Sequence, residues 1–284
     1  ADTWYNFRFL LLEGMPHPEM QPAVLATSMT GRTRTAPLAN AAVEQLRLGV
    51  VSCSCSYTGY FSAFRHLADM AERGELDLIV HLGDYLYSDI HNWPLDRTLR
   101  RPDFCKRRDD RDFAGQAPPA GSYICAASTL QEWRESHAFH RSDPDLQRAH
   151  QFVPWVVLWD DHDLQPRAHD ALPGPLHAQS ITDHGTRWHW ESEEATQAGW
   201  RAAARAFWEW TPTRPADASR PSILYRILTW GDLVDILMVD DRIFRGSAEV
   251  PNARDMREAW DRNRLLPDSM LGEEQWNWLD NQLQ

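Results

Sequence analysis

The chain has 284 residues, a formal net charge of −12 and 43% hydrophobic residues. This composition excludes an intrinsically disordered chain, and the acidic balance argues against a nucleic-acid-binding surface, which is usually basic. The length fits one large α/β domain or two smaller ones, and no apolar run approaches the roughly 20 residues of a transmembrane helix.

The first predicted elements are β-strands. Residues 3–12 alternate in polarity and are rich in aromatic side chains, and residues 27–37 (TSMTGRTRTAP) indicate a turn followed by a polar edge strand. This segment is too short to fold alone. We therefore expect residues 1–45 to be the end of an incomplete N-terminal β-sandwich domain, and residues 46–284 to be a second, catalytic domain.

A β-α-β unit is predicted next, over residues 47–83. Residues 47–52 and 76–82 are apolar strands, and residues 59–73 carry apolar side chains at helical spacing before Gly74. A strand–helix–strand unit implies a mostly parallel sheet whose site lies at the carboxyl ends of its strands.

The rest of the chain alternates predicted elements with irregular segments. We expect helices at 129–139, 143–151, 191–210 and 273–283, a third parallel strand at 154–159, and a β-hairpin formed by 224–229 and 234–239. The irregular segments are residues 91–128 and 164–190. Cys105 and Cys125 lie in the first of these and could form a disulfide in an oxidising compartment.

Chemically unusual side chains follow three strands of the predicted sheet. Cys53 follows the first strand, Asp84 and Tyr87 follow the second in HLGDYLYSD, and the third continues into DDHD at 160–163. Each residue alone has an ordinary interpretation as a turn, core or loop residue. Together, at one edge of a sheet, they favour a metal site, because carboxylate, phenolate and thiolate groups bind hard or borderline cations. Two such cations can hold a phosphoryl group and activate water.

At these residues the sequence resembles the PhoD-like alkaline phosphatases and phosphodiesterases of the metallophosphatase superfamily. The similar segments are GRTRTAP (31–37), SCSCSYTGYFSAFRHL (52–67), DLIVHLGDYLY (77–87), LQEWRESHAFHRSDPDLQRAHQFVPWVVLWDDHD (130–163), LYRILTWGDLVDILMVDDRIFR (224–245) and MLGEEQWNWL (270–279). The resemblance implies an α/β fold: a metallophosphatase-type β-sandwich flanked by helices in four αββα layers, preceded by the remnant of an immunoglobulin-like β domain.

The resemblance also implies metal-ligand roles. Cys53, rather than Cys55, matches the metal-binding cysteine of the family, and Asp84 matches the carboxylate that bridges two cations. Tyr87 has the Asp-x-x-Tyr spacing that related enzymes use for ferric iron. Asp161 stands where other metallophosphatases have an asparagine ligand. The implied ions are Fe³⁺ and Ca²⁺, with a divalent ion such as Zn²⁺ or Mg²⁺ as a substitute.

Two catalytic roles follow from the same resemblance. His162 matches the histidine that stabilises the transition state or protonates the leaving group, and Arg134 matches an arginine that could meet substrate phosphate. The implied partner is a small phosphate monoester or diester, attacked by a metal-bound hydroxide, and the implied location is secreted or periplasmic. The residues indicate no oligomeric state.

Departures from the family pattern leave alternatives open. Arg167 stands near the position of an asparagine that can bind calcium, and no Gly-Asp-x-His segment is present. We therefore expect a chain truncated at both ends, and one alternative is a catalytically incompetent fragment or metal-binding module that lacks C-terminal ligands. Another is a glycan hydrolase with Asp84 and Asp161 as its carboxylate pair, which gives Cys53 and Tyr87 no role.

Overall fold

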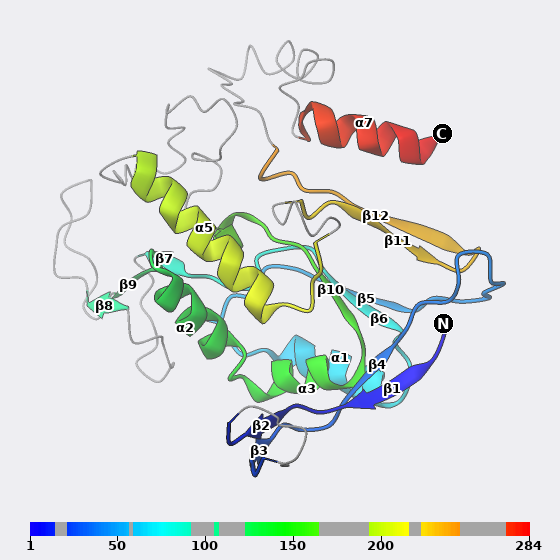
Figure 1. Ribbon diagram of the computed structural model, residues 1–284, viewed down its shortest axis with the longest axis horizontal. Helices are drawn as coiled ribbons and strands as arrows, with labels where there is room; N and C mark the ends of the chain where they lie inside the picture. The colour runs from blue at the N-terminus through cyan, green and yellow to red at the C-terminus, as the bar shows by residue number, and fades with distance from the viewer. Residues whose placement is uncertain are drawn as a thin grey trace.

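The computed structural model describes residues 1–14, 22–56, 59–91, 105–107, 123–164, 193–215, 223–244 and 271–284. The described elements, in chain order (Figure 1), are β1 (Trp4–Phe7), β2 (Leu10–Leu12), β3 (Val24–Thr27), β4 (Gly31–Arg34), β5 (Leu48–Val51), α1 (Ser62–Glu72), β6 (Leu78–His81), β7 (Asp89–His91), β8 (Lys106–Arg107), β9 (Tyr123–Ala126), α2 (Leu130–His140), α3 (Pro144–Phe152), β10 (Trp155–Val157), α4 (Asp161–Leu164), α5 (Glu193–Trp210), β11 (Arg226–Trp230), β12 (Val234–Met238) and α7 (Gly272–Leu283).

A parallel three-stranded sheet positions the site. Its strand order is β10-β6-β5, with Val80 of the central strand opposite both Val50 and Val156. All four residues of β6 are buried, which explains why this strand is a continuous apolar run rather than an alternating one. The predicted β-α-β unit and third parallel strand are therefore confirmed.

Local sequence signals set the ends of the helices around this sheet. Helix α1 ends before Gly74, whose φ of +73° suits a residue without a Cβ. Helix α2 begins with a capping box between Thr129 and Glu132, and α3 begins with Asp143 as its N-cap, followed by Pro144. Helices α1 and α3 pack together, as do α2 and α5. These helices and the sheet share one hydrophobic core.

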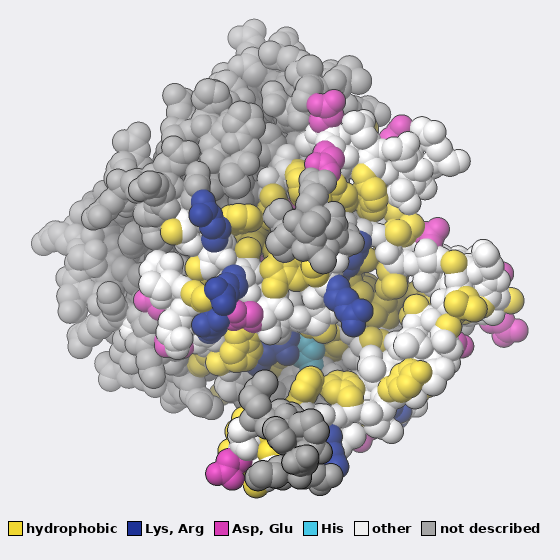
Figure 2. All heavy atoms as spheres, viewed as in Figure 1, with side chains coloured by type: hydrophobic (Ala, Val, Ile, Leu, Met, Phe, Trp, Pro, Cys, Tyr) yellow, Lys and Arg dark blue, Asp and Glu magenta, His cyan; other side chains and the backbone are white. Residues whose placement is uncertain are grey.

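The N-terminal strands differ from the prediction. The expected strand over residues 3–12 is divided into β1, which pairs with β4, and β2, which pairs with β3. The division falls at Arg8 and Phe9, where the Phe9 N–H donates to Ser28 Oγ at 2.8 Å instead of to a neighbouring strand. Hydrophobic side chains of β2 and β3 are exposed, and Figure 2 shows yellow side chains around these strands.

The predicted irregular segment 91–128 is wrong in part. It contains β8 and β9, which form a small antiparallel sheet with β7 in the order β7-β9-β8. These strands are two to four residues long, too short for a period-two pattern to mark them in the sequence. Residues 165–190 of the second predicted irregular segment lie outside the described residues.

The structure confirms the fold class and leaves the finer architecture as a prediction. The mixed α/β class is confirmed, whereas the four αββα layers, the immunoglobulin-like remnant and the boundary between 1–45 and 46–284 remain predictions. Cys105 is disulfide-bonded, whereas Cys53 and Cys55 are not in a disulfide. The side chain of Cys125, in β9, lies outside the described part of the chain. Among the described helices, none combines the length and apolarity that a membrane crossing requires.

Candidate metal centre

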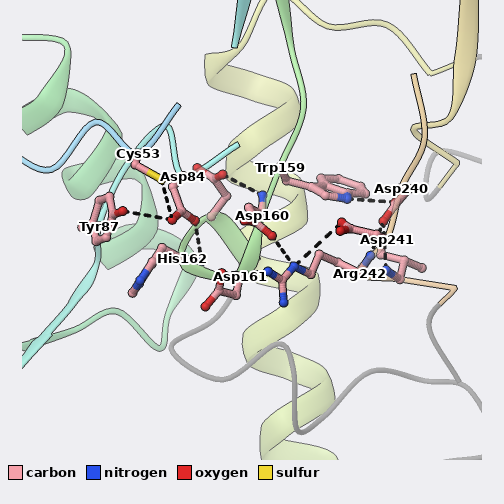
Figure 3. Close-up of polar contacts among 12 residues, drawn as sticks. Cys53, Asp84, Tyr87, Trp159, Asp160, Asp161, His162, Asp240, Asp241 and Arg242 are labelled. Atoms are coloured by element: carbon pink, nitrogen blue, oxygen red, sulfur yellow. Dashed lines mark hydrogen bonds and ion pairs between the residues drawn. The ribbon is translucent and has the colours of Figure 1, made fainter. Parts of the chain in front are cut away.

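The carboxyl ends of β5 and β6 are tied together by their backbones. The Cys53 N–H donates to the Gly83 carbonyl at 3.1 Å, and the Ser54 N–H donates to the Asp84 carbonyl at 2.8 Å. The parallel pairing therefore extends beyond both strands, and it brings Cys53 and Asp84, which are 31 positions apart, side by side (Figure 3).

Both of these residues have an unusual backbone conformation. Cys53 has φ +57° and Asp84 has φ +54°, and among the described non-glycine residues only Asp2 shares this left-handed conformation. Such a conformation costs about 1–2 kcal/mol for a residue with a Cβ, so it persists only where surrounding structure enforces it. Strain of this kind concentrates at functional sites, and here it accompanies two side chains that approach each other.

Gly83 allows the second and third strand ends to approach closely. Its φ is +118°, and a Cβ built at this position would lie 2.6 Å from Asp160 Cβ and 2.9 Å from Asp160 N. Only glycine fits there, because both the conformation and the space exclude a side chain. This contact places the DDHD segment, at the end of β10, against the residue that precedes Asp84.

We expect Gly83→Ala to lower the free energy of unfolding by roughly 2–4 kcal/mol, because it combines backbone strain with overlap against Asp160. Gly74→Ala is the matched control, since Gly74 also has positive φ but meets nothing within 4 Å. It should lose only about 1 kcal/mol. Urea denaturation of the metal-free chains measures both, and equal losses would contradict the proposed close approach.

Asp84 is the centre of the donor set. Tyr87 Oη donates to Asp84 Oδ2 at 3.0 Å, Cys53 Sγ lies 3.6 Å from the same oxygen, and the backbone N–H of His162 donates to Asp84 Oδ1 at 3.2 Å. Ligand atoms of Asp84, Asp161 and His162 lie within 4.8 Å of one another, so together they could hold a metal ion. The structure thus brings five predicted site residues together (Figure 3).

The electrostatics of this cluster favour a cation. Asp84 is only 5% exposed, and burial raises the pKa of its carboxyl, while Asp161 and Asp160 raise it further and His162 opposes them. Burial and the hydrogen bond with Cys53 also raise the pKa of the Tyr87 phenol. Among the described residues, no Lys or Arg contacts Asp84. A metal ion would supply the missing positive charge, so the donor chemistry fits the implied cofactor.

Arg242, which follows β12, was not predicted as a site residue. Its Nε contacts Asp160 Oδ1, and its Nη2 lies 3.2 Å from Asp161 Oδ1. The arginine is itself fixed by Asp240, whose Oδ1 accepts the Arg242 N–H at 2.9 Å and whose Oδ2 accepts Trp159 Nε1–H at 2.8 Å. Arg242 therefore supplies positive charge on the Asp161 side of the centre.

Comparison with known proteins identifies the family. Residues 48–284 match the PhoD-like phosphatase family. The chain belongs to the PhoD-like phosphatase family. It is 31% identical over 258 residues to alkaline phosphatase D of Bacillus subtilis (strain 168), a match that covers 90% of this chain and 38% of that protein. A solved structure of PhoD superposes with a TM-score of 0.67 at 27% identity, covering 99% of this chain and 44% of the other. The chain thus spans about two fifths of the length of these relatives.

Unlike its neighbours in the DDHD segment, Asp163 uses its carboxylate to hold the backbone beside the candidate metal centre. It is almost fully buried, its Oδ1 accepts the Leu86 N–H at 3.1 Å, and its Oδ2 accepts the Asp160 N–H at 2.9 Å. Burial raises the pKa of this carboxyl to about 8. Asp163 ties the loop after β6 to the loop after β10, and so it fixes the spacing between Asp84 and Asp161.

The remaining predicted residues lie elsewhere or outside the described part of the chain. Arg134 forms a bidentate ion pair with Glu209 of α5, with N–O distances of 2.6 and 2.7 Å. Among the described residues, no hydrogen bond connects Arg134 to the Asp84 cluster, so its phosphate-binding role stays a prediction. Arg167 lies outside the described residues. Cys53 contacts Asp84, at the position that the resemblance gave to the metal-binding cysteine.

Proposed function

We propose that this chain carries the metal-binding part of a metal-dependent phosphoesterase that hydrolyses small phosphate monoesters or diesters. The observation that supports this most directly is the convergence of a thiol, a phenol and a buried carboxylate at the ends of two parallel strands. Membership of the PhoD-like phosphatase family agrees with it. If these side chains were only structural or solvent-exposed, the fold would not need left-handed backbone conformations at both Cys53 and Asp84.

We propose that Cys53, Asp84 and Tyr87 hold Fe³⁺, and that Asp84 and Asp161 hold Ca²⁺ or another divalent ion. Thiolate and phenolate suit the trivalent ion, and carboxylates suit the harder divalent one. Bound cations would supply Lewis acidity toward the phosphoryl group and would lower the pKa of a water molecule to give a hydroxide nucleophile. Arg242 pairs with Asp161, so occupancy of the second position requires that this ion pair opens or is shared.

His162 is proposed to donate a proton to the leaving oxygen. Its backbone N–H is fixed on Asp84, and its imidazole lies against the Tyr87 ring with centroids 4.1 Å apart. These two contacts hold the ring beside the cluster, where an acid would meet the ester oxygen as the P–O bond breaks. The ester oxygen then leaves as an alcohol, and the phosphate remains.

The alternative functions have less support. A glycan hydrolase would leave unexplained why Cys53 and Tyr87 both lie on Asp84. An incompetent metal-binding module predicts bound metal without turnover, which the experiment below separates from the leading proposal. The disulfide at Cys105 supports a secreted or periplasmic location, because such bonds persist in oxidising compartments.

We expect His162→Ala to retain bound metal and to lose turnover by roughly 10²–10⁴-fold, the usual contribution of a general acid. The loss should be larger for an alkyl phosphate ester than for a p-nitrophenyl ester, whose leaving group needs little protonation. His66→Ala is the control, because His66 is an exposed residue of α1.

Metal analysis and rate measurements on both ester classes distinguish the outcomes. A loss of metal from His162→Ala would make this histidine a ligand rather than the acid. A metal-loaded wild-type chain without turnover on either ester would favour the metal-binding module instead.

A further inference from the structure

A cavity of about 630 Å³ lies between the N-terminal strands, α3 and the C-terminal end of α5. None of its lining residues belongs to the Asp84 centre. In Figure 2 this face is hollowed, with hydrophobic side chains around the hollow and Lys, Arg and His side chains near its base. Aromatic side chains of Phe7, Phe9, Trp155 and Trp210 line it. The volume is typical of a site for a small organic molecule.

Arg141, at the end of α2, is the charged residue that determines which ligands the cavity could bind. Arg141 lines the cavity, and its guanidinium stacks over the Tyr85 ring at 5.3 Å. The Nε and Nη2 atoms of this guanidinium are buried without a hydrogen-bond partner. No carboxylate of the described residues pairs with it. Burying guanidinium nitrogens without hydrogen bonds or a counter-charge is unfavourable. A bound anion would supply both.

The other charges around the cavity do not neutralise Arg141. Arg32 donates to the carbonyl oxygens of Phe152 and Ala71, so its charge is not balanced by a carboxylate either. Glu209, the carboxylate that lines the cavity, is already paired with two other arginines, Arg134 and Arg205. The cavity is therefore electropositive within a chain whose net charge is −12.

We propose that this cavity binds a small organic carboxylate with an aromatic or aliphatic body, and that Arg141 turns to present two N–H groups to the carboxylate. The Nε and Nη2 atoms of Arg141 lack hydrogen-bond partners, and the planar fork of this guanidinium matches a carboxylate. The aromatic walls bury the body of the ligand. Inorganic phosphate fits less well, because it has no apolar body to fill the aromatic walls. This site is independent of the proposed phosphoesterase activity.

Calorimetric titration of the 284-residue chain with 3-phenylpropionate tests the proposal. We expect one molecule to bind per cavity, and Arg141→Met to weaken this binding by at least about tenfold, because bonds to a charged group are lost. 3-Phenylpropionamide, which lacks the charge, and acetate, which lacks the body, should both bind much more weakly. Arg205→Gln is the matched control, since this exposed arginine of α5 pairs with the same Glu209.

Thermal unfolding without ligand provides a second readout. Arg141→Met should raise the melting temperature of the ligand-free chain, because it removes a buried charge without a partner. Unchanged affinity in Arg141→Met, equal affinity for the amide, or binding of inorganic phosphate in place of 3-phenylpropionate would each overturn the proposal. If Arg141→Met does not fold, Arg141→Lys keeps the charge without the fork and should bind the carboxylate measurably more weakly than wild type.

Discussion

Asp84→Asn is expected to remove bound metal from the protein while leaving it folded. Asparagine has the shape of aspartate and is one of the few residues that tolerate the left-handed backbone found here, φ +54°. It cannot bridge cations as a carboxylate does, and both proposed metal positions share this side chain. We therefore expect metal affinity to fall by at least about 100-fold, which corresponds to roughly 2.7 kcal/mol.

Although Asp84→Asn should lower metal affinity, it should not lower the stability of the metal-free protein. Because burial raises the pKa of Asp84, its charged form is disfavoured in the metal-free fold, and Asp84→Asn removes that cost. The metal-free variant should consequently be at least as stable as wild type. Elemental analysis and thermal unfolding measure the two effects, with Asp235→Asn, on the exposed side of β12, as the control.

One result would contradict the bridging role directly. If Asp84→Asn kept its full metal content, the ion would be held by Asp161 and His162 without the buried carboxylate. A variant that lost metal only because it unfolded would show a lowered melting temperature in the metal-free state. The two measurements together separate these cases.

Most of the centre could be predicted because its residues follow strands that the sequence makes obvious. The apolar runs of β5, β6 and β10 end at Cys53, at Asp84 and at the DDHD segment, and parallel strands place their carboxyl ends on one edge. Because the three strands were expected in one parallel sheet, the meeting of these side chains at its edge could be expected as well. The approach of Tyr87 to Asp84 was implied by the resemblance to enzymes that share this Asp-x-x-Tyr spacing.

What the sequence did not predict depends on contacts between distant segments. Arg242 is 81 positions from Asp161, and nothing local in VDDRIFR indicates which carboxylate its guanidinium meets. The buried role of Asp163 is equally hidden, because DDHD does not reveal which of its carboxylates faces inward. The ion pair of Arg134 with Glu209 depends on how α2 packs against α5, which helical periodicity leaves undetermined.

Mild acid should destabilise the fold strongly, because four histidines, His81, His137, His140 and His150, are held neutral within it. His81 accepts or donates a 2.7 Å hydrogen bond with Ser54 Oγ, and His150 does so with Tyr85 Oη at 2.8 Å. His137 stacks on Trp210, and both of its ring nitrogens lack hydrogen-bond partners. Burial lowers the pKa of His81 to about 3 and that of His140 to about 4. Burial also lowers the pKa values of His137 and His150 well below 6.5, and the Arg141 charge lowers these two further.

Because the histidine pKa values are lowered in the folded state, the stability of the fold decreases as the pH falls. The folded-state pKa values lie below the unfolded value of about 6.5, so the unfolded chain binds more protons once the pH falls below 6.5. Stability is therefore complete above about pH 7.5 and is lost as the pH falls, by up to about 1.4 kcal/mol per histidine per pH unit. At pH 5.5 the four groups together should remove roughly 5–6 kcal/mol, a large part of the stability of a typical domain.

Urea denaturation at pH 8 and at pH 5.5, on wild type and His137→Phe, tests this expectation. Phenylalanine keeps the aromatic packing on Trp210 and removes two unsatisfied nitrogens, so the variant should gain about 1–3 kcal/mol at pH 8. It should also lose about one quarter less stability than wild type between the two pH values, because one of four titrating groups is gone. An unchanged pH dependence in His137→Phe would show that carboxylates, rather than buried histidines, govern the response to acid.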